Sequence, residues 1–357
     1  SLAGLERGLT DAEAGVGVPR TTVARRPDRP RLVVPPTAAP RRVSVITVTY
    51  RSEGQVRAAL DSALAAATHA GFSLEIVVVD NASPDRSVAL VRSAYPEAIV
   101  IENRTNLGFG TACNQAFDHA SGDLWLLLNP DAALDPGARG RLVAFLDDHR
   151  EAAAVGARIV AGSQTRSENA GMAPGLRSLA GHFLLLNMVL PWGGWRGFFV
   201  TRGPAAAPIK VDWCGAAVLL VRPKAIRAVG GFDPTFFLYG EDVDLGIRLT
   251  AEGWEVWLDP SATARHEMGG SQPGISTRWV DGTLDVVRRR NGPVRARVAA
   301  GIMAVGLAAR AVLAAVRYDT PEARHHSTVM RASAGRALAH VLANVPPRRD
   351  QRNRRDQ

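Results

Sequence analysis

The stretch VSVITVTY, residues 43–50, decides the fold class of this chain. Its β-branched and apolar side chains predict a buried strand. Apolar residues then recur at intervals of four, which predicts a helix over residues 54–68. The alternation continues, with expected strands at 74–79, 98–101 and 124–128 and expected helices at 85–94 and 109–119. Because fully apolar strands that alternate with helices form parallel sheets covered on both faces, we expect an α/β fold with a mostly parallel central sheet.

The second half of the chain is less regular. Residues 150–210 are rich in Gly and Pro, and we expect loops there, including a segment over the site. Order resumes with an expected strand at 211–221, a helix at 243–252 and a strand at 255–258. We therefore divide the chain into a loosely packed lead-in at 1–42, an α/β domain at 43–278 and a basic helical region at 279–357.

Composition and charge narrow the class of protein. With 46% hydrophobic and 22% charged residues, the chain is globular. Its two cysteines, Cys113 and Cys214, form no CxxC pair, which favours a reducing compartment. No apolar run precedes a small-residue cleavage site, so we expect no signal peptide.

The formal net charge of +9 resides in residues 279–357, which hold 15 Arg and 6 acidic residues. This region has few aromatic residues and no nucleic-acid-binding motif, so an anionic membrane surface is the favoured partner over nucleic acid.

Two helices are expected in the basic region, the first over residues 294–317. Residues 298–316 are apolar except for Arg310, but their many Ala and Gly residues make a membrane span a weak interpretation. Thr320 as N-cap and Pro321 at the first position predict the start of a second helix. The arginines that share a helix face are Arg310 with Arg317 and Arg324 with Arg331. A helix with an Arg face and an apolar face lies in a membrane interface, whereas ordinary packed helices with solvated Arg are the alternative.

The sequence GEDVDLGIR, residues 240–248, crowds three carboxylates into four residues: Glu241, Asp242 and Asp244. Carboxylates this close repel one another, so stability gives little reason for the cluster. A bound cation or a proton to be moved is one explanation. A solvated first helical turn is the other, because acidic residues are favoured there.

Polar residues also follow two of the expected strands. Asp80 and Asp131 stand directly after strand ends, where parallel sheets bind ligands, and this shared position predicts a nucleotide site. Asp80 is able to accept hydrogen bonds from a ribose or a base edge, with an Asx-turn or an N-cap as the alternative. The glycine-containing turn NRTNLGFGTACN, residues 103–114, opens a helix whose amides can approach phosphate or sugar oxygens, although it is neither a GxGxxG motif nor a P-loop.

A divalent cation is the expected cofactor. Asn129-Pro130-Asp131 places a carboxylate where it can bind Mg²⁺ or Mn²⁺ that bridges a diphosphate. His266 adds a nitrogen ligand, which Mn²⁺ accepts more readily than Mg²⁺. A structural or solvated histidine is the alternative.

Taken together, these motifs resemble family 2 inverting glycosyltransferases. The motifs, in the order seen in that family, are VSVITVTY, VVVDNASPD, NRTNLGFGTACNQA, LLLNPDA, WCGAAVLLVR, GGFDPTFFLYGEDVDLGIRLTAEGW and RHEMGGS. They cover roughly residues 43–270, and they are closest to bacterial, particularly mycobacterial, rhamnosyltransferases that act on polyprenyl-diphosphate-linked GlcNAc. The resemblance implies a GT-A fold, a Rossmann-like sheet flanked by helices, here followed by a C-terminal helical extension.

The resemblance also implies roles for individual residues. Asp242 matches the catalytic base of the family's ED motif, with Glu241 beside it. The metal ligands would be Asp131 and His266. Asn129 stands where the family's DxD motif has its first carboxylate, so one acidic ligand is replaced by an amide. The implied nucleotide-sugar-binding residues are Thr49, Tyr50, Asp80, Asn81, Asn106, Gly108, Asn129 and Asp131, and the implied sugar or acceptor pocket comprises Trp213, Cys214, Gly215 and Asp244.

The implied activity is metal-dependent transfer of L-rhamnose from dTDP-rhamnose to a hydroxyl of a lipid-linked or cell-wall glycan. The enzyme would be cytoplasmic and peripheral on the inner face of the cell membrane. Another donor, such as UDP-galactofuranose, UDP-GlcNAc or UDP-glucose, is the alternative on the same fold. A nucleotidyltransferase shares the sheet and the metal but carries a Gly-rich, Arg/Lys-containing signature after its first strand, where this chain has only Thr49-Tyr50-Arg51-Ser52. A binding module without activity has no need of the Glu241-Asp242 pair together with Asp131 and His266, so it is the least favoured alternative. The sequence does not indicate an oligomeric state.

Overall fold

The computed structural model describes residues 41–65, 72–160, 169–186, 197–200, 206–266, 277–317 and 321–342. The described residues all belong to one compact unit, residues 40–357. The predicted lead-in at 1–42 therefore lies almost wholly outside the described residues, and the three-part division of the chain stays a prediction.

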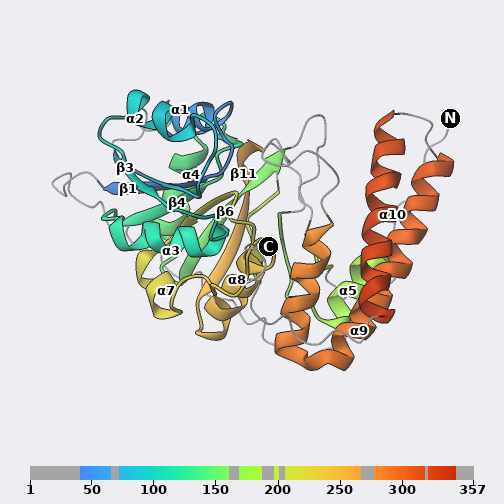
Figure 1. The fold of residues 1–357 in the computed structure, drawn as a ribbon. Coiled ribbons are helices and arrows are strands. Elements are labelled where there is room, and N and C mark those ends of the chain that lie inside the picture. Colours follow the sequence, from blue (N-terminus) through green and yellow to red (C-terminus); the bar gives the residue numbers. More distant parts are fainter. Residues whose placement is uncertain are drawn as a thin grey trace, which may run out of the picture. The chain divides into compact units, whose positions relative to one another are not determined.

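A nine-stranded mixed sheet forms the centre of the fold, in the order β3-β2-β1-β4-β10-β6-β11-β5, with β8 paired to β11 (Figure 1). The first four strands are β1 (Arg42–Thr49), β2 (Ser73–Asp80), β3 (Ile99–Glu102) and β4 (Leu124–Leu128). These four strands pair in parallel, so their carboxyl ends lie along one edge of the sheet. The predicted parallel α/β half of the fold is confirmed.

Helices cover both faces of this sheet because successive strand residues point to opposite sides. In β1, Val43 and Val45 face one apolar cluster with α1 (Val56–Ala65), α2 (Ser87–Ala94) and α4 (Ala138–Asp148). Ile46 and Val48 face a second cluster with α3 (Phe109–His119), α7 (Pro223–Ala228) and α8 (Glu241–Ala251). The sheet is thus buried on both sides, as its apolar strands require.

The second half of the sheet corrects the prediction of loops at 150–210. The remaining strands of the main sheet are β5 (Ala132–Leu134), β6 (Ala152–Val160), β8 (Ile209–Val211), β10 (Val218–Val221) and β11 (Glu255–His266). β6 lies inside the sheet between β10 and β11, and β10 runs antiparallel to both β4 and β6. Most residues of β6 are Ala or Gly, whose low β-propensity explains why the sequence did not predict this strand.

The strand predicted at 211–221 is broken in two. β9 (Trp213–Cys214) leaves the main sheet to pair with β7 (Ala170–Gly171), and β10 begins only at Val218. The predicted helix at 243–252 begins two residues earlier, at Glu241. The predicted strand at 255–258 continues to His266, which places that histidine on the sheet.

Three helices pack together beyond the sheet: α5 (Leu176–Phe183), α9 (Arg278–Arg317) and α10 (Pro321–Leu342). Inside α9, Gly292 has a φ of 84° and precedes Pro293, so the helix is kinked there. The helix predicted at 294–317 is thus the second segment of α9, whereas Thr320 lies outside the described residues. Among the described residues, α9 is the one helix long and apolar enough to cross a membrane by length and composition alone, and 33% of its most apolar window is buried.

Candidate active site

The predicted nucleotide residues cluster at the carboxyl edge of β1 and β2. Thr49 Oγ1 donates to Asp80 Oδ1 at 2.8 Å, and the Ser83 amide donates to Asp80 Oδ2 at 2.8 Å. Asp80 and its neighbour Asn81 are buried. The Ser83 amide lies three residues after Asp80, which is the spacing of the N-cap alternative and not of an Asx-turn, and both carboxylate oxygens already have a partner within the chain. The role of Asp80 in nucleotide binding therefore stays a prediction.

The start of α3 closes against this cluster. Asn81 Nδ2 donates to the Gly108 carbonyl at 3.1 Å, and the Gly108 amide donates to Asn106 Oδ1 at 3.0 Å. Gly108 has a φ of 86°, and a Cβ there would lie 2.3 Å from the carbonyl oxygen of Phe237. Only glycine fits such a position. The turn thereby connects the edge of β2 to the aromatic run that leads into α8.

The acidic cluster sits at the start of α8 and is not solvated. Gly240, with a φ of 96°, is the N-cap, and Glu241 and Asp242 form the first helical turn. Glu241 is 5% exposed, and its Oε2 has no hydrogen-bond partner. Asp242 is partly buried. The solvated helix start that was the alternative for this motif is therefore wrong for Glu241 and Asp242.

Burial changes the protonation of both side chains. Burial, followed by the charge of Asp242, raises the pKa of Glu241 well above its ordinary value. Burial also raises the pKa of Asp242, although the backbone N–H groups of Val243, Asp242 and Ala216 oppose that rise. Both carboxyls therefore hold a proton to a higher pH than isolated groups would, and the backbone hydrogen bonds favour the anion at Asp242.

The loop between β9 and β10 brings backbone atoms to Asp242. A Cβ on Gly215 would lie 3.5 Å from Asp242 Oδ2, so the predicted pocket residue Gly215 is a direct neighbour of the predicted base. The Gly215 amide donates to the Asn169 carbonyl at 2.7 Å, and two residues on, the Ala217 carbonyl accepts from the Asn129 amide at 2.9 Å. Residues 215–217 therefore connect Asp242 to the end of β4.

Asn129, Asp131 and His266 converge at that end. His266 Nε2 lies 2.9 Å from Asp131 Oδ1 and 3.4 Å from Asn129 Nδ2. The side chains of His266 and Asp131 remain 15% and 11% exposed. Within the described part of the chain, no third His, Cys, Asp or Glu completes a metal-binding group. One carboxylate and one imidazole, with an amide beside them, fit a cation that takes its other ligands from phosphates and water.

Other predicted pocket residues have structural partners. Asp244 Oδ2 accepts from Arg248 Nε at 2.7 Å, an ion pair between residues four apart on α8. Trp213 is buried against Phe198 and donates through Nε1 to the Met172 carbonyl at 3.0 Å. Cys214 and Cys113 are buried, as free thiols. The Tyr50 ring lies against the Arg51 guanidinium at the end of β1.

Three asparagines that the sequence analysis did not single out help to build the site. Asn103 Nδ2 donates to Asn81 Oδ1 at 2.9 Å, and Asn114 joins α3 to the Phe232 backbone by two hydrogen bonds of 2.8 Å. Asn169 holds both Gly215 and the Ala157 carbonyl of β6. Asn103 and Asn114 belong to the quoted NRTNLGFGTACN motif, whereas Asn169 lies in the stretch predicted as loops.

Known proteins resemble the chain over this region. The family model described as Glycosyl transferase family 2 matches residues 44–201. An N-acetylglucosaminyl-diphospho-decaprenol L-rhamnosyltransferase of Mycobacterium tuberculosis is 29% identical over 243 residues, which are 64% of this chain and 76% of that protein. Rhamnosyltransferase WbbL of Escherichia coli is 41% identical over 56 residues, 16% of this chain and 21% of that protein.

A solved structure shows the fold. The mannosyltransferase PcManGT from Pyrobaculum calidifontis, in complex with GDP-Man and Mn²⁺, superposes with a TM-score of 0.50 at 19% identity, covering 88% of this chain and 91% of that one. This likeness and the mixed sheet described above identify a GT-A fold. Through residues 44–201, the chain therefore carries a domain of glycosyl transferase family 2.

Proposed function

We propose that the chain is a metal-dependent inverting rhamnosyltransferase that moves L-rhamnose from dTDP-rhamnose to a hydroxyl of polyprenyl-diphosphate-linked GlcNAc. The observation that carries the proposal is the position of Asp242, in the first turn of α8 with its carboxylate beside Gly215 and the backbone of Ala216. The relatives named as rhamnosyltransferases support the choice of sugar, and the name of the mycobacterial relative supports the lipid-linked acceptor.

Asp242 acts as the general base in this proposal. It removes the proton of the acceptor hydroxyl while that oxygen attacks the anomeric carbon of the sugar. The nucleotide diphosphate leaves from the opposite side, so the anomeric configuration is inverted. A raised pKa suits this role because a base whose conjugate acid titrates nearer to neutrality accepts the proton more readily.

Asp131 and His266 would hold the divalent cation, with Asn129 beside them. A bound Mg²⁺ or Mn²⁺ would supply neutralisation of the charge on the leaving diphosphate. Around it, Asn106 and Gly108 would position the sugar nucleotide at the start of α3, and Thr49, Tyr50, Asp80 and Asn81 would bind the base and ribose. The 2.9 Å contact between His266 and Asp131 supports one shared ligand position.

The C-terminal helices would hold the enzyme on the inner face of the cell membrane. On the second segment of α9, five exposed valines are spaced four, seven, seven and four residues apart, which places them on one helix face. These valines, here named the valine stripe, are Val294, Val298, Val305, Val312 and Val316. An apolar stripe on a basic helical region is the pattern of a helix that lies in a membrane interface.

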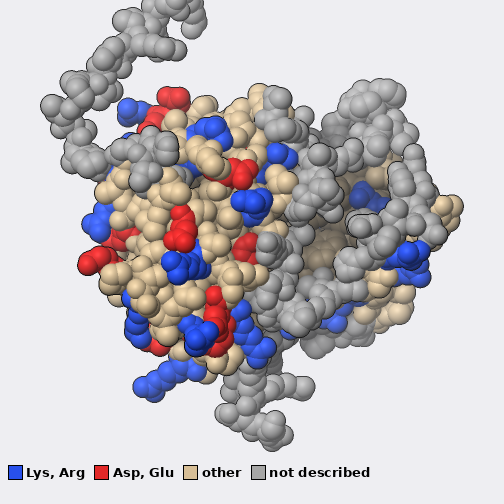
Figure 2. Space-filling view, turned by 90° about the horizontal axis from the view of Figure 1, so that it is seen from above, with Lys and Arg blue, Asp and Glu red and all other residues tan. Residues whose placement is uncertain are grey.

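Arg310 does not belong to the Arg face that was expected there. Its guanidinium donates to the His182 carbonyl and lies over the Phe183 ring, so it packs α9 against α5. In Figure 2, Lys and Arg mingle with Asp and Glu at the left of the view, whereas the charged side chains visible at the right are Lys and Arg. The valine stripe and the net positive charge of residues 279–357 therefore support the membrane contact.

A thermal-shift panel tests the donor and the metal. The whole chain is melted with dTDP-rhamnose, UDP-galactofuranose, UDP-GlcNAc, UDP-glucose and GDP-mannose, each with and without Mn²⁺. We expect dTDP-rhamnose with Mn²⁺ to stabilise by about 2.7 kcal/mol when the ligand is at about one hundred times its Kd. If only a UDP-sugar stabilises the chain, dTDP-rhamnose is not the donor. If dTDP-rhamnose stabilises the chain equally without Mn²⁺, donor binding does not depend on the metal.

A further inference from the structure

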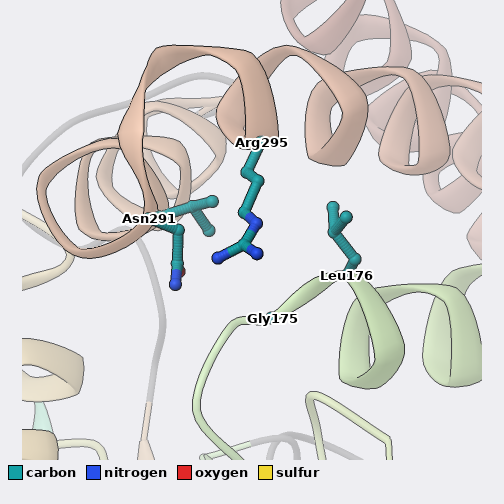
Figure 3. A pocket seen from close by; sticks show the side chains of 5 residues that line it. Gly175, Leu176, Asn291 and Arg295 are labelled. Atoms are coloured by element: carbon teal, nitrogen blue, oxygen red, sulfur yellow. The ribbon is translucent and has the colours of Figure 1, made fainter.

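A cavity of about 230 Å³ lies between the start of α5 and the kink of α9. Its lining residues are Gly175, Leu176, Val287, Asn291 and Arg295. Figure 3 shows the Asn291 and Arg295 side chains projecting from α9 into the space that faces Gly175 and Leu176. None of these residues belongs to the candidate active site.

The kink of α9 creates this arrangement. Gly292, with a φ of 84°, ends the first helical segment, and Pro293 provides no backbone N–H to continue the hydrogen-bond ladder. Asn291 is consequently the last side chain before the break, and Arg295 lies in the first turn after it. Residues four apart share a helix face, and the kink bends the axis between Asn291 and Arg295, whose side chains both lie beside the cavity (Figure 3).

Arg295 is a cation without a partner. Among the described residues, no carboxylate pairs with its guanidinium, and none lines the cavity. Two arginines on the first segment of α9 differ: Arg288 pairs with Asp285, and Arg289 pairs with Asp233 and lies over the Phe236 ring. An arginine and an amide that face one cavity, with no carboxylate among its described lining residues, favour an anion.

Size and surroundings narrow the class of anion. A volume of about 230 Å³ is below the roughly 300–1,000 Å³ of pockets that enclose a whole small molecule, so the cavity suits one charged group of a larger ligand. The valine stripe begins beside the cavity, at Val294, which is 70% exposed, and continues through Val298. A ligand with an anionic group in the cavity and an apolar chain along the valine stripe would be an amphiphile.

We propose that this cavity binds a phosphate group carried on a long apolar chain. The group is either the diphosphate of the lipid-linked acceptor or the headgroup of a bilayer phospholipid. The first source rests on the proposed function, which requires a lipid-linked acceptor, whereas the second does not. Arg295 binds two phosphate oxygens, Asn291 donates from its amide, and the valine stripe contacts the chain.

The test compares Arg295→Gln with Arg290→Gln in the full chain. Arg290 is an exposed arginine on the first segment of α9, outside the cavity, so its substitution removes the same charge. Flotation is measured on vesicles of phosphatidylcholine alone, with added phosphatidylglycerol, and with added undecaprenyl diphosphate. No donor sugar is present, so failure of the transferase proposal leaves the result unchanged.

Loss of a charge-assisted contact weakens binding about tenfold. We expect this loss for Arg295→Gln on undecaprenyl diphosphate vesicles, a change below twofold for Arg290→Gln, and displacement of the wild type by free inorganic pyrophosphate. An equal selective loss on phosphatidylglycerol vesicles would support the phosphate site and assign it to bulk phospholipid. Equal losses for the two variants on every vesicle, or no loss for Arg295→Gln, would overturn the proposal. Because Arg295 is exposed and unpaired, its variant should melt at the temperature of the wild type.

Discussion

At the scale of residues, the position of Asp242 depends on two glycines. A Cβ on Gly240 would lie 2.9 Å from the Gly282 carbonyl oxygen, and the φ of 96° at Gly240 is unfavourable for other residues. A Cβ on Gly246 would lie 2.5 Å from the Asp212 carbonyl oxygen, so α8 approaches the chain before β9 closely. These two contacts fix both the start of α8 and its distance from Gly215.

Asp242→Asn should lower the rate of transfer by orders of magnitude while leaving the fold and donor binding intact. Asparagine keeps the shape of the carboxylate but does not accept the proton, and loss of a general base lowers turnover by about 10²- to 10⁴-fold. Turnover is measured with lipid-linked GlcNAc, and donor binding by thermal shift. Asp118→Asn, at an exposed position of α3, is the control. Turnover of Asp242→Asn near that of the wild type would remove Asp242 from the mechanism.

Glu241→Gln should make the protein more stable at neutral pH. The raised pKa of Glu241 means that the folded protein holds this proton more tightly than the unfolded chain does. The free energy of unfolding therefore falls as pH rises from about 4.3, the ordinary glutamate value, toward the raised pKa. Glutamine keeps the neutral form, so we expect a gain on the order of 1 kcal/mol at pH 7 that disappears near pH 4.

Urea unfolding of Glu241→Gln at several pH values measures this difference. Glu252→Gln, exposed at the end of the same helix, should stay within about 0.5 kcal/mol of the wild type. A loss of stability in Glu241→Gln at pH 7 would show that the buried carboxyl is ionised and paired in the folded protein.

The sequence predicted some residue contacts and could not predict others. Asp131 and His266 were expected to share a site, and they lie 2.9 Å apart although 135 residues separate them in sequence. The ion pair of Asp244 with Arg248 was predictable from their spacing of four on a helix. The resemblance to the family assigned Asp244 to the sugar or acceptor pocket instead. Asn169 gave no signal, because its role depends on the turn that places its carbonyl beside Gly215.

At the scale of elements, the strands of large β-branched side chains were predictable and the strand of small ones was not. β1 through β4 and the three helices between them lie where the sequence placed them, within a few residues. β6 was not predicted because its small side chains have low β-propensity. The packing requires small residues there, since a Cβ on Gly156 would lie 3.0 Å from Cys214 Sγ. The break between β9 and β10 was also not predicted, because it depends on the contact of Gly215 with Asp242 of α8, which no local sequence pattern indicates.

Asp281 joins the two C-terminal helices and should make their packing sensitive to acid. Its carboxylate accepts from Arg336 at 2.8 and 2.7 Å and from His340 at 2.7 Å. Burial alone would raise the pKa of Asp281, but these hydrogen bonds lower it to about 2. A depressed carboxyl pKa contributes stability at neutral pH that is lost as pH falls from about 4 to about 2.

Asp281→Asn should therefore cost about 2 kcal/mol at pH 7, and the difference from the wild type should vanish near pH 2. Urea unfolding across this pH range measures both effects. Glu102→Gln breaks the exposed pair with Arg92 and is the control, expected to cost less than about 1 kcal/mol. A pH-independent cost for Asp281→Asn would attribute the effect to packing instead of charge.

At the scale of the whole molecule, the GT-A half and the C-terminal helices pose different problems for prediction. The alternating strands and helices specified the sheet, because each element is apolar where it contacts the next. The charge of residues 279–357 predicted an anionic partner but not which face meets it. That face emerges only when α5 and α10 cover one side of α9 and leave the valine stripe exposed.

The double variant Val305→Ser with Val312→Ser tests the valine stripe as the membrane contact. These side chains are 63% and 62% exposed, so serine there should leave the melting temperature unchanged. If both enter the bilayer interface, their loss removes about 1 kcal/mol each or more and weakens vesicle binding at least tenfold. Leu107→Ser, at an exposed apolar position of the α/β part, is the matched control and should bind vesicles as the wild type does.

If the stripe instead joins two copies of the chain, the double variant will sediment as a smaller species than the wild type and float with vesicles equally well. Because membrane insertion and self-association predict opposite results in these two measurements, one pair of experiments decides which surface the exposed face of α9 contacts.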